Sequence, residues 1–218
     1  GRDRSVIYCA DVERMLADVP APGIAEPRIP SIIGLAEELD IRDTGTTGHS
    51  RTVGGYAQMM ARELGFAPEH VERVRLAGLV HDIGKTGVSD RLISKSGPLD
   101  AEEWRSIRTH PEIGARLLAH PEFEDLRAWV LAHHERPDGN GYPSGLAGEE
   151  IPIEASILAV ADAYEAMTSE RSYRSTLGEE MAVAELQAGA GTQFDATVVA
   201  VFLHALARLE SAAMPQAS

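Results

Sequence analysis

Apolar positions recur with the period of an α-helix along most of the chain. Between residues 48 and 65 they share one stripe, and Gly65 suits the end of that helix. Pro68 suits the first turn of a second helix, whose stripe runs to His81. The same spacing predicts further helices over 101–108, 111–119, 122–134, 153–168, 178–188 and 195–208. No strand-like alternation of useful length follows residue 30, so the sequence predicts an all-α bundle.

Two segments interrupt the helical pattern. Residues 18–30 contain four of the chain's prolines, which fix the backbone and remove donors, so this segment is predicted to be an extended linker. Residues 136–152 are dense in glycine and proline and are predicted to form a structured loop. The main domain is therefore expected over 31–208, with a short N-terminal extension before it and a flexible tail over 209–218.

Composition narrows the classes of function. Hydrophobic residues make up 44% of the 218 positions, enough for a packed core. The formal net charge of −14 argues against a groove for duplex nucleic acid, whereas a few local cations can still hold a small ligand with two phosphates. Cys9 is the only cysteine, which excludes an intrachain disulfide and a thiolate-rich metal site, and fits a reducing cytoplasm.

The sequence shows neither a run of 18 apolar residues nor a signal-peptide pattern at its start. We therefore expect this segment to be cytoplasmic. Because Gly1 is not an initiator methionine, the segment is compatible with a longer protein that is anchored in a membrane upstream.

Histidines and aspartates gather where the pattern predicts helix ends and buried positions. An ionised carboxylate in the apolar run around Asp162 is costly unless it is paired or bound to metal. Ligands from separate helices can converge in the core of a bundle. The candidate set is His49, His81, Asp82, His110, His133, His134 and Asp162.

This nitrogen and oxygen set suits iron, manganese or zinc and is large enough for two metals. Asp82 can bridge them, and the pair would turn a shared water into hydroxide. Lys85, beyond His81, is placed to neutralise a phosphate. Structural alternatives remain open: each histidine can be a core or surface residue, Asp162 can pair with Arg171 or Arg174, and Lys85 can be a helix-terminal cation.

An ordered set of motifs resembles the HD-GYP family over residues 40–203. HDIGK at 81–85 is shared by HD phosphohydrolases in general, whereas HHE followed by DGNGYP is far more specific. The full set is DTGTTGHS (43–50), HDIGK (81–85), HPEIG (110–114), HHERPDGNGYPSGL (133–146), ADAYEAMTSERSYR (161–174) and AGTQFD (190–195).

The resemblance implies an HD-type helical bundle around a metal site, with phosphodiesterase activity that opens cyclic di-GMP to linear pGpG or GMP. The seven histidines and aspartates would be metal ligands, with Asp82 and Lys85 in catalytic roles. Lys85, Arg171 and Arg174 would hold substrate phosphates, since guanidinium groups suit phosphate oxygens. Tyr142 would shape the substrate site or a loop that binds a partner.

Some positions depart from the family's pattern. Gly45 stands where some members carry a glutamate for a third metal, so two metals are predicted, with iron or manganese favoured. Glu165 replaces the usual aspartate and Pro137 a common aromatic residue. The glutamate can alter the surroundings of the ligands, which leaves rate and product open.

Several readings beyond this one stay open. GRDRSVIY (1–8) resembles the closing strand of a GGDEF domain, which would make residues 1–17 the end of such a domain. The same chemistry could act on another nucleotide, or the chain could be a regulatory module that binds a nucleotide or a GGDEF protein; the complete ligand set disfavours the latter. The apolar positions Ile32, Leu35 and Leu39 are too few to decide whether the chain forms a homodimer.

Overall fold

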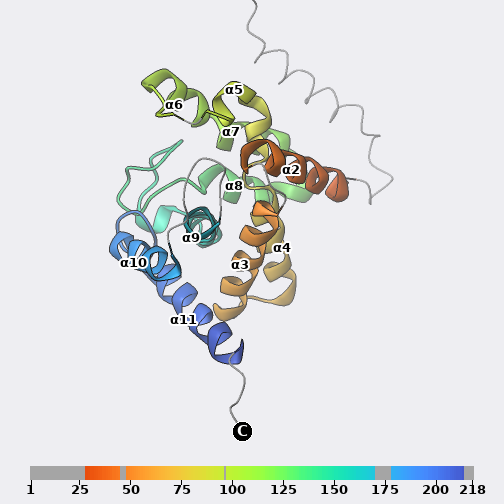
Figure 1. Cartoon of the computed structure of the whole chain (residues 1–218). Coiled ribbons are helices and arrows are strands. Elements are labelled where there is room, and N and C mark those ends of the chain that lie inside the picture. The colour runs from red at the N-terminus through yellow and green to blue at the C-terminus, as the bar shows by residue number, and fades with distance from the viewer. Residues whose placement is uncertain (1–27, 45–47, 96, 170–177, 214–218) are drawn as a thin grey trace, which may run out of the picture.

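The computed structural model describes residues 28–44, 48–95, 97–169 and 178–213 (Figure 1). In these ranges every named element is a helix, and the only β pairing is an isolated bridge between Ala190 and Phe194. The α-helices are α2 (Arg28–Thr44), α3 (His49–Glu63), α4 (Pro68–Val80), α5 (Asp90–Ile93), α6 (Ala101–Ile107), α7 (His110–Leu117), α8 (Glu124–Ala132), α9 (Ile153–Thr168), α10 (Glu179–Gly189) and α11 (Ala196–Ala213). The 3-10 helices are η1 (Ile83–Gly87), η2 (Pro121–Phe123) and η3 (Gly148–Glu150). The expectation of an all-α bundle is confirmed.

The predicted helices are present, with differences at their ends. The helix over 153–168 is found with those bounds as α9, while the one over 122–134 divides into η2 and α8 and stops before His133. Helix α2 begins at Arg28, inside the predicted linker, and α11 continues to Ala213, inside the predicted tail. Residues 1–17 and the rest of the linker lie outside the described residues, so the domain boundaries stay predictions.

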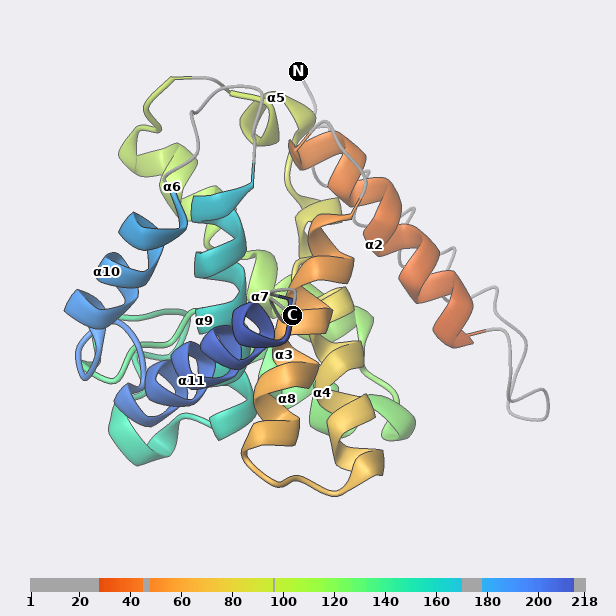
Figure 2. The ribbon, with the colours of Figure 1, turned by 60° about the horizontal axis from the view of Figure 1, so that its bottom comes forward.

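The core lies where α3, α4 and α9 meet. Figure 2 shows α3 and α4 running side by side, and two glycines explain how closely they approach. A Cβ atom at Gly78 would lie 2.8 Å from the Cα atom of Gly54, so the two backbones are nearly in contact. Val53, Met60 and Ile157 are fully buried between these helices. Such dense packing gives rigid helix ends on which a site can be built.

Helix α2 packs against the same core. Ile32 and Leu39 are buried, at 8% and 4% exposure, and Leu35 lies partly buried beside the core cluster. These positions, which were too few in the sequence to decide whether the chain forms a homodimer, contact the chain's own bundle.

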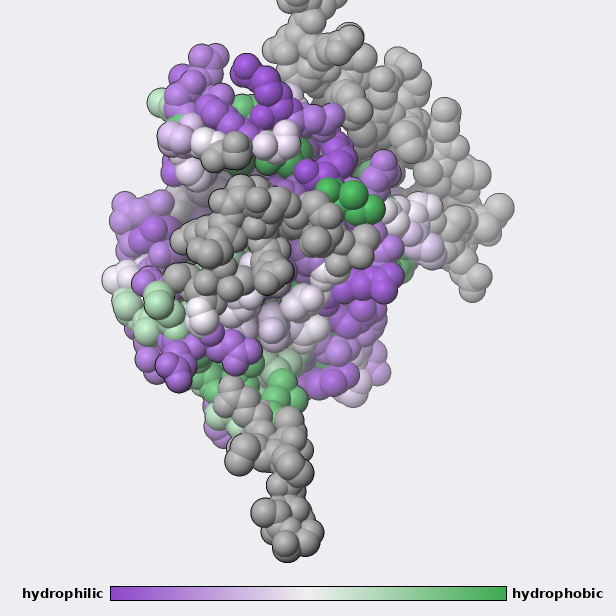
Figure 3. Space-filling model, viewed as in Figure 1, coloured by the Kyte–Doolittle hydropathy of each residue, from purple (hydrophilic) through white to green (hydrophobic). Residues whose placement is uncertain are grey.

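The surface of the bundle is largely polar on one face. Hydrophilic residues cover much of the face drawn in Figure 3, with small hydrophobic groups between them. Among the described residues, none of the helices is long and apolar enough to cross a membrane.

Candidate metal centre

The seven predicted ligands lie together because helix ends converge on one region. His49 opens α3, His81 ends α4 and Asp82 precedes η1. His110 opens α7, and His133 and His134 follow α8, while Asp162 projects from within α9. Six of the seven fall into two groups whose ligand atoms lie within 4.8 Å of one another: Asp82, His110, His133 and His134, and His49, His81 and Asp82.

Asp82 belongs to both groups. Its Oδ2 atom lies 3.3 Å from Nε2 of His81 and 3.9 Å from Nε2 of His49. Its other oxygen, Oδ1, lies 3.2 Å from Nε2 of His110, which is itself 3.3 Å from Nε2 of His133. Each carboxylate oxygen of Asp82 thus faces a different set of histidines, the arrangement that a bridging ligand needs.

Asp162 completes the first group from the opposite side. Its Oδ1 atom lies 3.6 Å from Nε2 of His49 and 3.8 Å from Nε2 of His81. The Asp162 side chain is 23% exposed, so this carboxylate lies at the border of the core rather than inside it. The apolar run around it packs on the core, while this carboxylate points into the centre.

Three histidines are fixed by their own helices. In His81, His110 and His133, the Nδ1 atom lies close to the carbonyl oxygen of the residue three positions earlier. A carbonyl only accepts, so Nδ1 carries the proton and the Nε2 lone pair is left for a metal. The carbonyls belong to Gly78, Ile107 and Val130, at 2.8, 2.8 and 2.6 Å.

His49 has a different support, a buried carboxylate. Its Nδ1 atom lies 2.5 Å from Oε2 of Glu165, and the Ser169 hydroxyl donates to the other oxygen of Glu165 at 2.7 Å. Glu165, noted in the sequence as a departure from the family pattern, therefore contacts a ligand and orients its ring.

The donor set fits a bound metal. His81 is completely buried, and in the described part of the chain its Nε2 is the one buried side-chain polar atom without a hydrogen-bond partner. Leaving such an atom unpaired costs about 1–3 kcal/mol. A cation bound between His81, Asp82 and His49 would satisfy it.

Burial favours neutral imidazoles at His110, His133 and His134 beside ionised carboxylates, whereas at His81 the charges of Asp82 and Asp162 outweigh burial and raise the pKa. Burial, reinforced by neighbouring imidazoles, lowers the pKa of His133 well below its usual value and that of His134 to about 3. Burial opposes ionisation of Asp82, but the charge of Lys85 and then His81 outweighs it and holds the pKa of that carboxyl well below its usual range. Neutral imidazoles and ionised carboxylates are the protonation states that metal ligation requires.

Lys85 lies at the edge of the centre and pairs with two carboxylates. Its Nζ atom is 2.6 Å from Oδ2 of Asp43 and 2.7 Å from Oδ2 of Asp82. Burial disfavours the charged ammonium, but these two carboxylates raise its pKa above the ordinary value. Lys85 lies in the last turn of η1, beyond the end of α4. An ammonium has three N–H donors, and one remains for a substrate oxygen.

Helix α2 supplies two acids that sequence reasoning missed. Asp43 holds Lys85, and Asp40 accepts hydrogen bonds from the backbone of Gly48 and Ser50 and from the Ser50 hydroxyl, at 3.2, 3.0 and 2.6 Å. Asp40 therefore fixes the start of α3, where His49 lies. Asp43 could have been noticed as the first residue of the DTGTTGHS motif, whereas the role of Asp40 depends on how α2 packs.

The loop over 136–152 is ordered around a buried carboxylate. Glu135 accepts hydrogen bonds from the backbone N–H groups of Ser144 and Leu146, at 2.6 and 3.0 Å. Tyr142, in turn, donates its backbone N–H to the carbonyl of His134 at 3.2 Å, and its ring stacks on the His134 imidazole at 4.8 Å between centroids. The structure thus places Tyr142 against a candidate ligand.

Arg171 and Arg174, the predicted phosphate-binding arginines, lie outside the described residues, as does Gly45. Pro137 lies within the loop, where its carbonyl accepts a hydrogen bond from the N–H of Gly148 at 3.1 Å.

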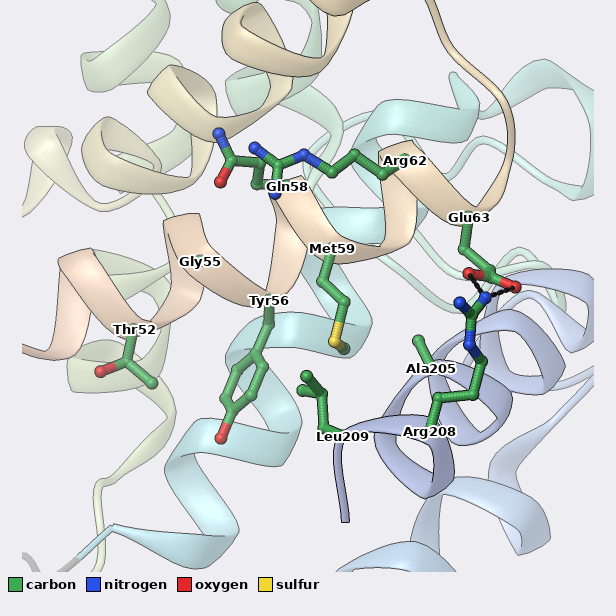
Figure 4. A pocket seen from close by; sticks show the side chains of 10 residues that line it. All are labelled: Thr52, Gly55, Tyr56, Gln58, Met59, Arg62, Glu63, Ala205, Arg208 and Leu209. Atoms are coloured by element: carbon green, nitrogen blue, oxygen red, sulfur yellow. Dashed lines mark hydrogen bonds and ion pairs between the residues drawn. The ribbon is translucent and has the colours of Figure 1, made fainter. Parts of the chain in front are cut away.

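A large groove lies apart from this centre, between α3 and α11. It encloses about 600 Å³, and none of the candidate ligands lines it. Figure 4 shows Tyr56, Met59 and Leu209 directed into it beside the ion pair of Glu63 and Arg208, whose closest atoms are 3.1 Å apart. Its mainly apolar walls lack grouped metal ligands, so we place the chemistry at the Asp82 centre.

Comparison with known proteins agrees with this arrangement. The model of the HD domain family matches residues 34–198. The chain is 36% identical to the cyclic di-GMP phosphodiesterase response regulator RpfG of Xanthomonas campestris over 91% of its own length. It is 38% identical to a cyclic di-GMP phosphodiesterase of Thermotoga maritima over 75% of the chain. It is also 36% identical to the 3′3′-cGAMP-specific phosphodiesterase 3 of Vibrio cholerae over 77% of the chain.

The chain spans about half or less of these relatives, covering 53%, 45% and 37% of their lengths. Among solved structures, a cyclic GMP-AMP specific phosphodiesterase of V. cholerae resembles it with a TM-score of 0.62 at 18% identity, over 86% of this chain and 51% of that one. The HD domain of the phosphodiesterase PgpH of Listeria monocytogenes, in complex with cyclic di-AMP, gives 0.55 at 20% identity, over 85% and 99%. Both likenesses concern the fold. Because the HD domain family model matches residues 34–198, the chain belongs to this family, and its motifs are those of the HD-GYP type.

Proposed function

We propose that this chain is a metal-dependent phosphodiesterase that hydrolyses cyclic di-GMP to linear pGpG or GMP. The observation that carries the proposal is the position of Asp82, whose two oxygens face two separate groups of histidines. A centre of this kind suits phosphoryl transfer, because two adjacent cations can act on one phosphate.

Two divalent ions, iron or manganese, would be held on the two sides of Asp82. His49, His81 and Asp162 would hold the first with Asp82, and the second would be held by His110, His133 and His134 with Asp82. Bound there, the metals would polarise a phosphoryl oxygen and lower the pKa of water. The backbone carbonyls behind His81, His110 and His133 hold these three rings in place and would leave their Nε2 atoms for the metals.

Lys85 would bind the phosphate from the side of α2. Asp43 and Asp82 use two of its donors and hold the ammonium at the edge of the centre, while the third remains for an equatorial oxygen whose charge grows during reaction. Tyr142 would form one wall of the substrate site, since its ring lies against His134. Roles for Arg171 and Arg174 in holding phosphate stay predictions.

The nature of the substrate rests on the relatives. Cyclic di-GMP is named for the proteins of X. campestris and T. maritima, and 3′3′-cGAMP for a V. cholerae protein of similar identity. The latter makes 3′3′-cGAMP a second candidate substrate for the same chemistry. A GGDEF partner, a homodimer and a cytoplasmic location also remain predictions from the sequence.

The proposal is tested by turnover. The anaerobically purified chain is incubated with cyclic di-GMP or 3′3′-cGAMP and Fe(II) or Mn(II), and products are followed by chromatography. A double variant, His81→Ala with Asp82→Ala, is the control, because it removes ligands from both sides of the centre. We expect hydrolysis by the wild type alone.

Each result has a distinct meaning. Faster hydrolysis of 3′3′-cGAMP than of cyclic di-GMP would change the substrate and leave the reaction in place. Full activity in the double variant, or no turnover by wild-type protein that holds two metals and binds the nucleotide, would contradict the proposal; the latter result favours a regulatory binding module.

A further inference from the structure

Arg108 lies between two aromatic residues beside the candidate metal centre. Its guanidinium carbon is 5.7 Å from the ring centroid of Trp104 and 5.0 Å from that of Tyr142. Arg108 follows the last residue of α6 and precedes His110 by two positions, so its backbone is fixed close to a candidate ligand. Cation–π contacts of this kind hold a guanidinium in a defined position.

The contact continues inward to the centre. The Tyr142 ring stacks on the His134 imidazole with an interplanar angle of 29°. A row of planar groups therefore runs from the candidate ligand His134 through Tyr142 and Arg108 to Trp104. At its outer end the Trp104 side chain is 47% exposed, one of the few large hydrophobic residues left open to solvent in the described part of the chain.

Arg108 differs from most arginines of this acidic chain. Arg73, Arg75 and Arg136, among others, pair with carboxylates. In the ranges that the structure describes, Arg108 forms no ion pair, although the net charge of the chain is −14. Its contacts are with rings, and its in-plane N–H donors are not used by a carboxylate.

The chemistry of this row matches a purine base. An exposed indole offers a flat surface on which a base can stack, and guanidinium N–H groups match the O6 and N7 acceptors of guanine. Adenine carries an amino group where guanine carries O6, so the same donors would discriminate between the two. A cyclic dinucleotide whose phosphate lies at the metal centre carries its bases outward.

We propose that Trp104 and Arg108 bind a guanine base of the substrate, with Trp104 stacking on the base and Arg108 donating to O6 and N7. The inference rests on the proposed function, because it assumes that a cyclic dinucleotide occupies the Asp82 centre. Arg108 is then a specificity-determining residue, held in place by Tyr142.

Calorimetry on the metal-loaded chain tests this assignment. The probes are hydrolysis-resistant phosphorothioate analogues of cyclic di-GMP and cyclic di-AMP. We expect Arg108→Ala to weaken binding of the guanine analogue about tenfold or more, with a smaller effect on the adenine analogue. Arg108→Lys should lose most of the same preference, because an ammonium keeps the charge but lacks the fork. Trp104→Ala should weaken both analogues, since stacking tolerates either base.

Arg105→Ala is the matched control. It removes the same charge one turn earlier in α6, from an exposed residue that bonds only the Ala101 carbonyl in the described structure. Melting temperature and metal content of every variant exclude loss of fold or of the centre. We expect Arg105→Ala to bind as the wild type does.

The outcomes separate this inference from the proposed function. Equal affinity of Arg108→Ala and Arg105→Ala for the guanine analogue would overturn the inference and leave the phosphodiesterase proposal intact. If Arg108→Ala lost the same affinity for both analogues, Arg108 would contact a phosphate instead. That result would overturn its proposed contact with guanine. Wild-type protein that binds neither analogue would overturn both proposals together.

Discussion

Asp82 offers one carboxylate oxygen to His49 and His81 and the other to His110. Asp162 contacts only the first of these sides, so the two carboxylates are not equivalent although both are aspartates in one centre. At the scale of single residues, this difference is the feature that separates a bridging ligand from a terminal one.

The difference predicts unequal metal loss. We expect Asp82→Ala to bring metal content from about two ions per chain to near zero, because both sites lose a ligand. Asp162→Ala should retain about one ion, held by Asp82, His110, His133 and His134. Elemental analysis after gel filtration measures both. Equal metal content in the two variants would contradict the bridging role of Asp82.

The sequence predicted the candidate ligands, but it did not predict the residues that hold them in position. His81 and Asp82 were proposed because the ordered combination of motifs is specific, although HDIGK by itself is shared by HD phosphohydrolases in general, and because ligation requires those residue types. Asp40 was missed because a carboxylate on one helix gains meaning only when packing brings it to the start of another. Glu165 was noticed as an unusual residue, but its contact with His49 joins positions far apart in the chain and depends on how α3 meets α9.

At the scale of elements, η1 sets the distance between the two histidine groups. It connects His81 and Asp82 to the rest of the chain and lies directly against the start of α7. A Cβ atom at Gly84 would come within 1.9 Å of the carbonyl oxygen of His110, so only glycine permits this contact. The glycine of the HDIGK motif is therefore needed for the close packing of η1 against α7.

Replacing this glycine should be costly. We expect Gly84→Ala to lower the free energy of unfolding by about 3 kcal/mol or more, because backbone must move to admit the methyl group. Gly55→Ala is the control at an exposed position of α3, where a Cβ would meet nothing within 4 Å; it should raise stability by about 0.5–1 kcal/mol. Urea unfolding of both variants measures the difference. A stability loss below 1 kcal/mol in Gly84→Ala would refute the close contact.

Long helices with a repeated apolar pattern were predicted from the sequence, whereas short 3-10 turns were not. Helix α9 was predicted with the bounds it has, because its apolar positions recur with helical spacing over its whole length. Helix η1 was not predicted, because a 3-10 turn of a few residues lacks a periodic signal. The helix expected to reach 134 stops at Ala132, because His133 and His134 turn toward the centre.

At the scale of the whole molecule, the buried imidazoles tie stability to pH. His110, His133 and His134 all have lowered pKa values, chiefly because burial disfavours their charged forms. His81 has a raised pKa, because Asp82 and Asp162 outweigh its burial, so it stays protonated below pH 6.5 in both folded and unfolded states.

Metal-free protein should therefore lose stability in mild acid. Unfolded His134 takes up a proton near pH 6.5, whereas the folded residue does so only near pH 3. Between these values the unfolded state binds more protons, so the free energy of unfolding falls as pH falls. Urea midpoints from pH 7 to 4.5 measure the slope, and comparison with a His134 variant separates the imidazole contribution from carboxylates that begin to titrate at the acid end.

His134→Gln should reduce this slope, because it removes an imidazole whose pKa is lowered in the folded state. A midpoint that rises from pH 6.5 to 4.5 in the metal-free wild type would contradict the lowered pKa values.

The central claim is that two metals share Asp82, and anomalous diffraction from crystals of the Mn(II)-loaded chain tests it most directly. We expect two peaks about 3.5–4 Å apart, one on each side of Asp82, with His81 beside the first and His110 beside the second. A single peak, or two peaks that do not share Asp82, would contradict the account.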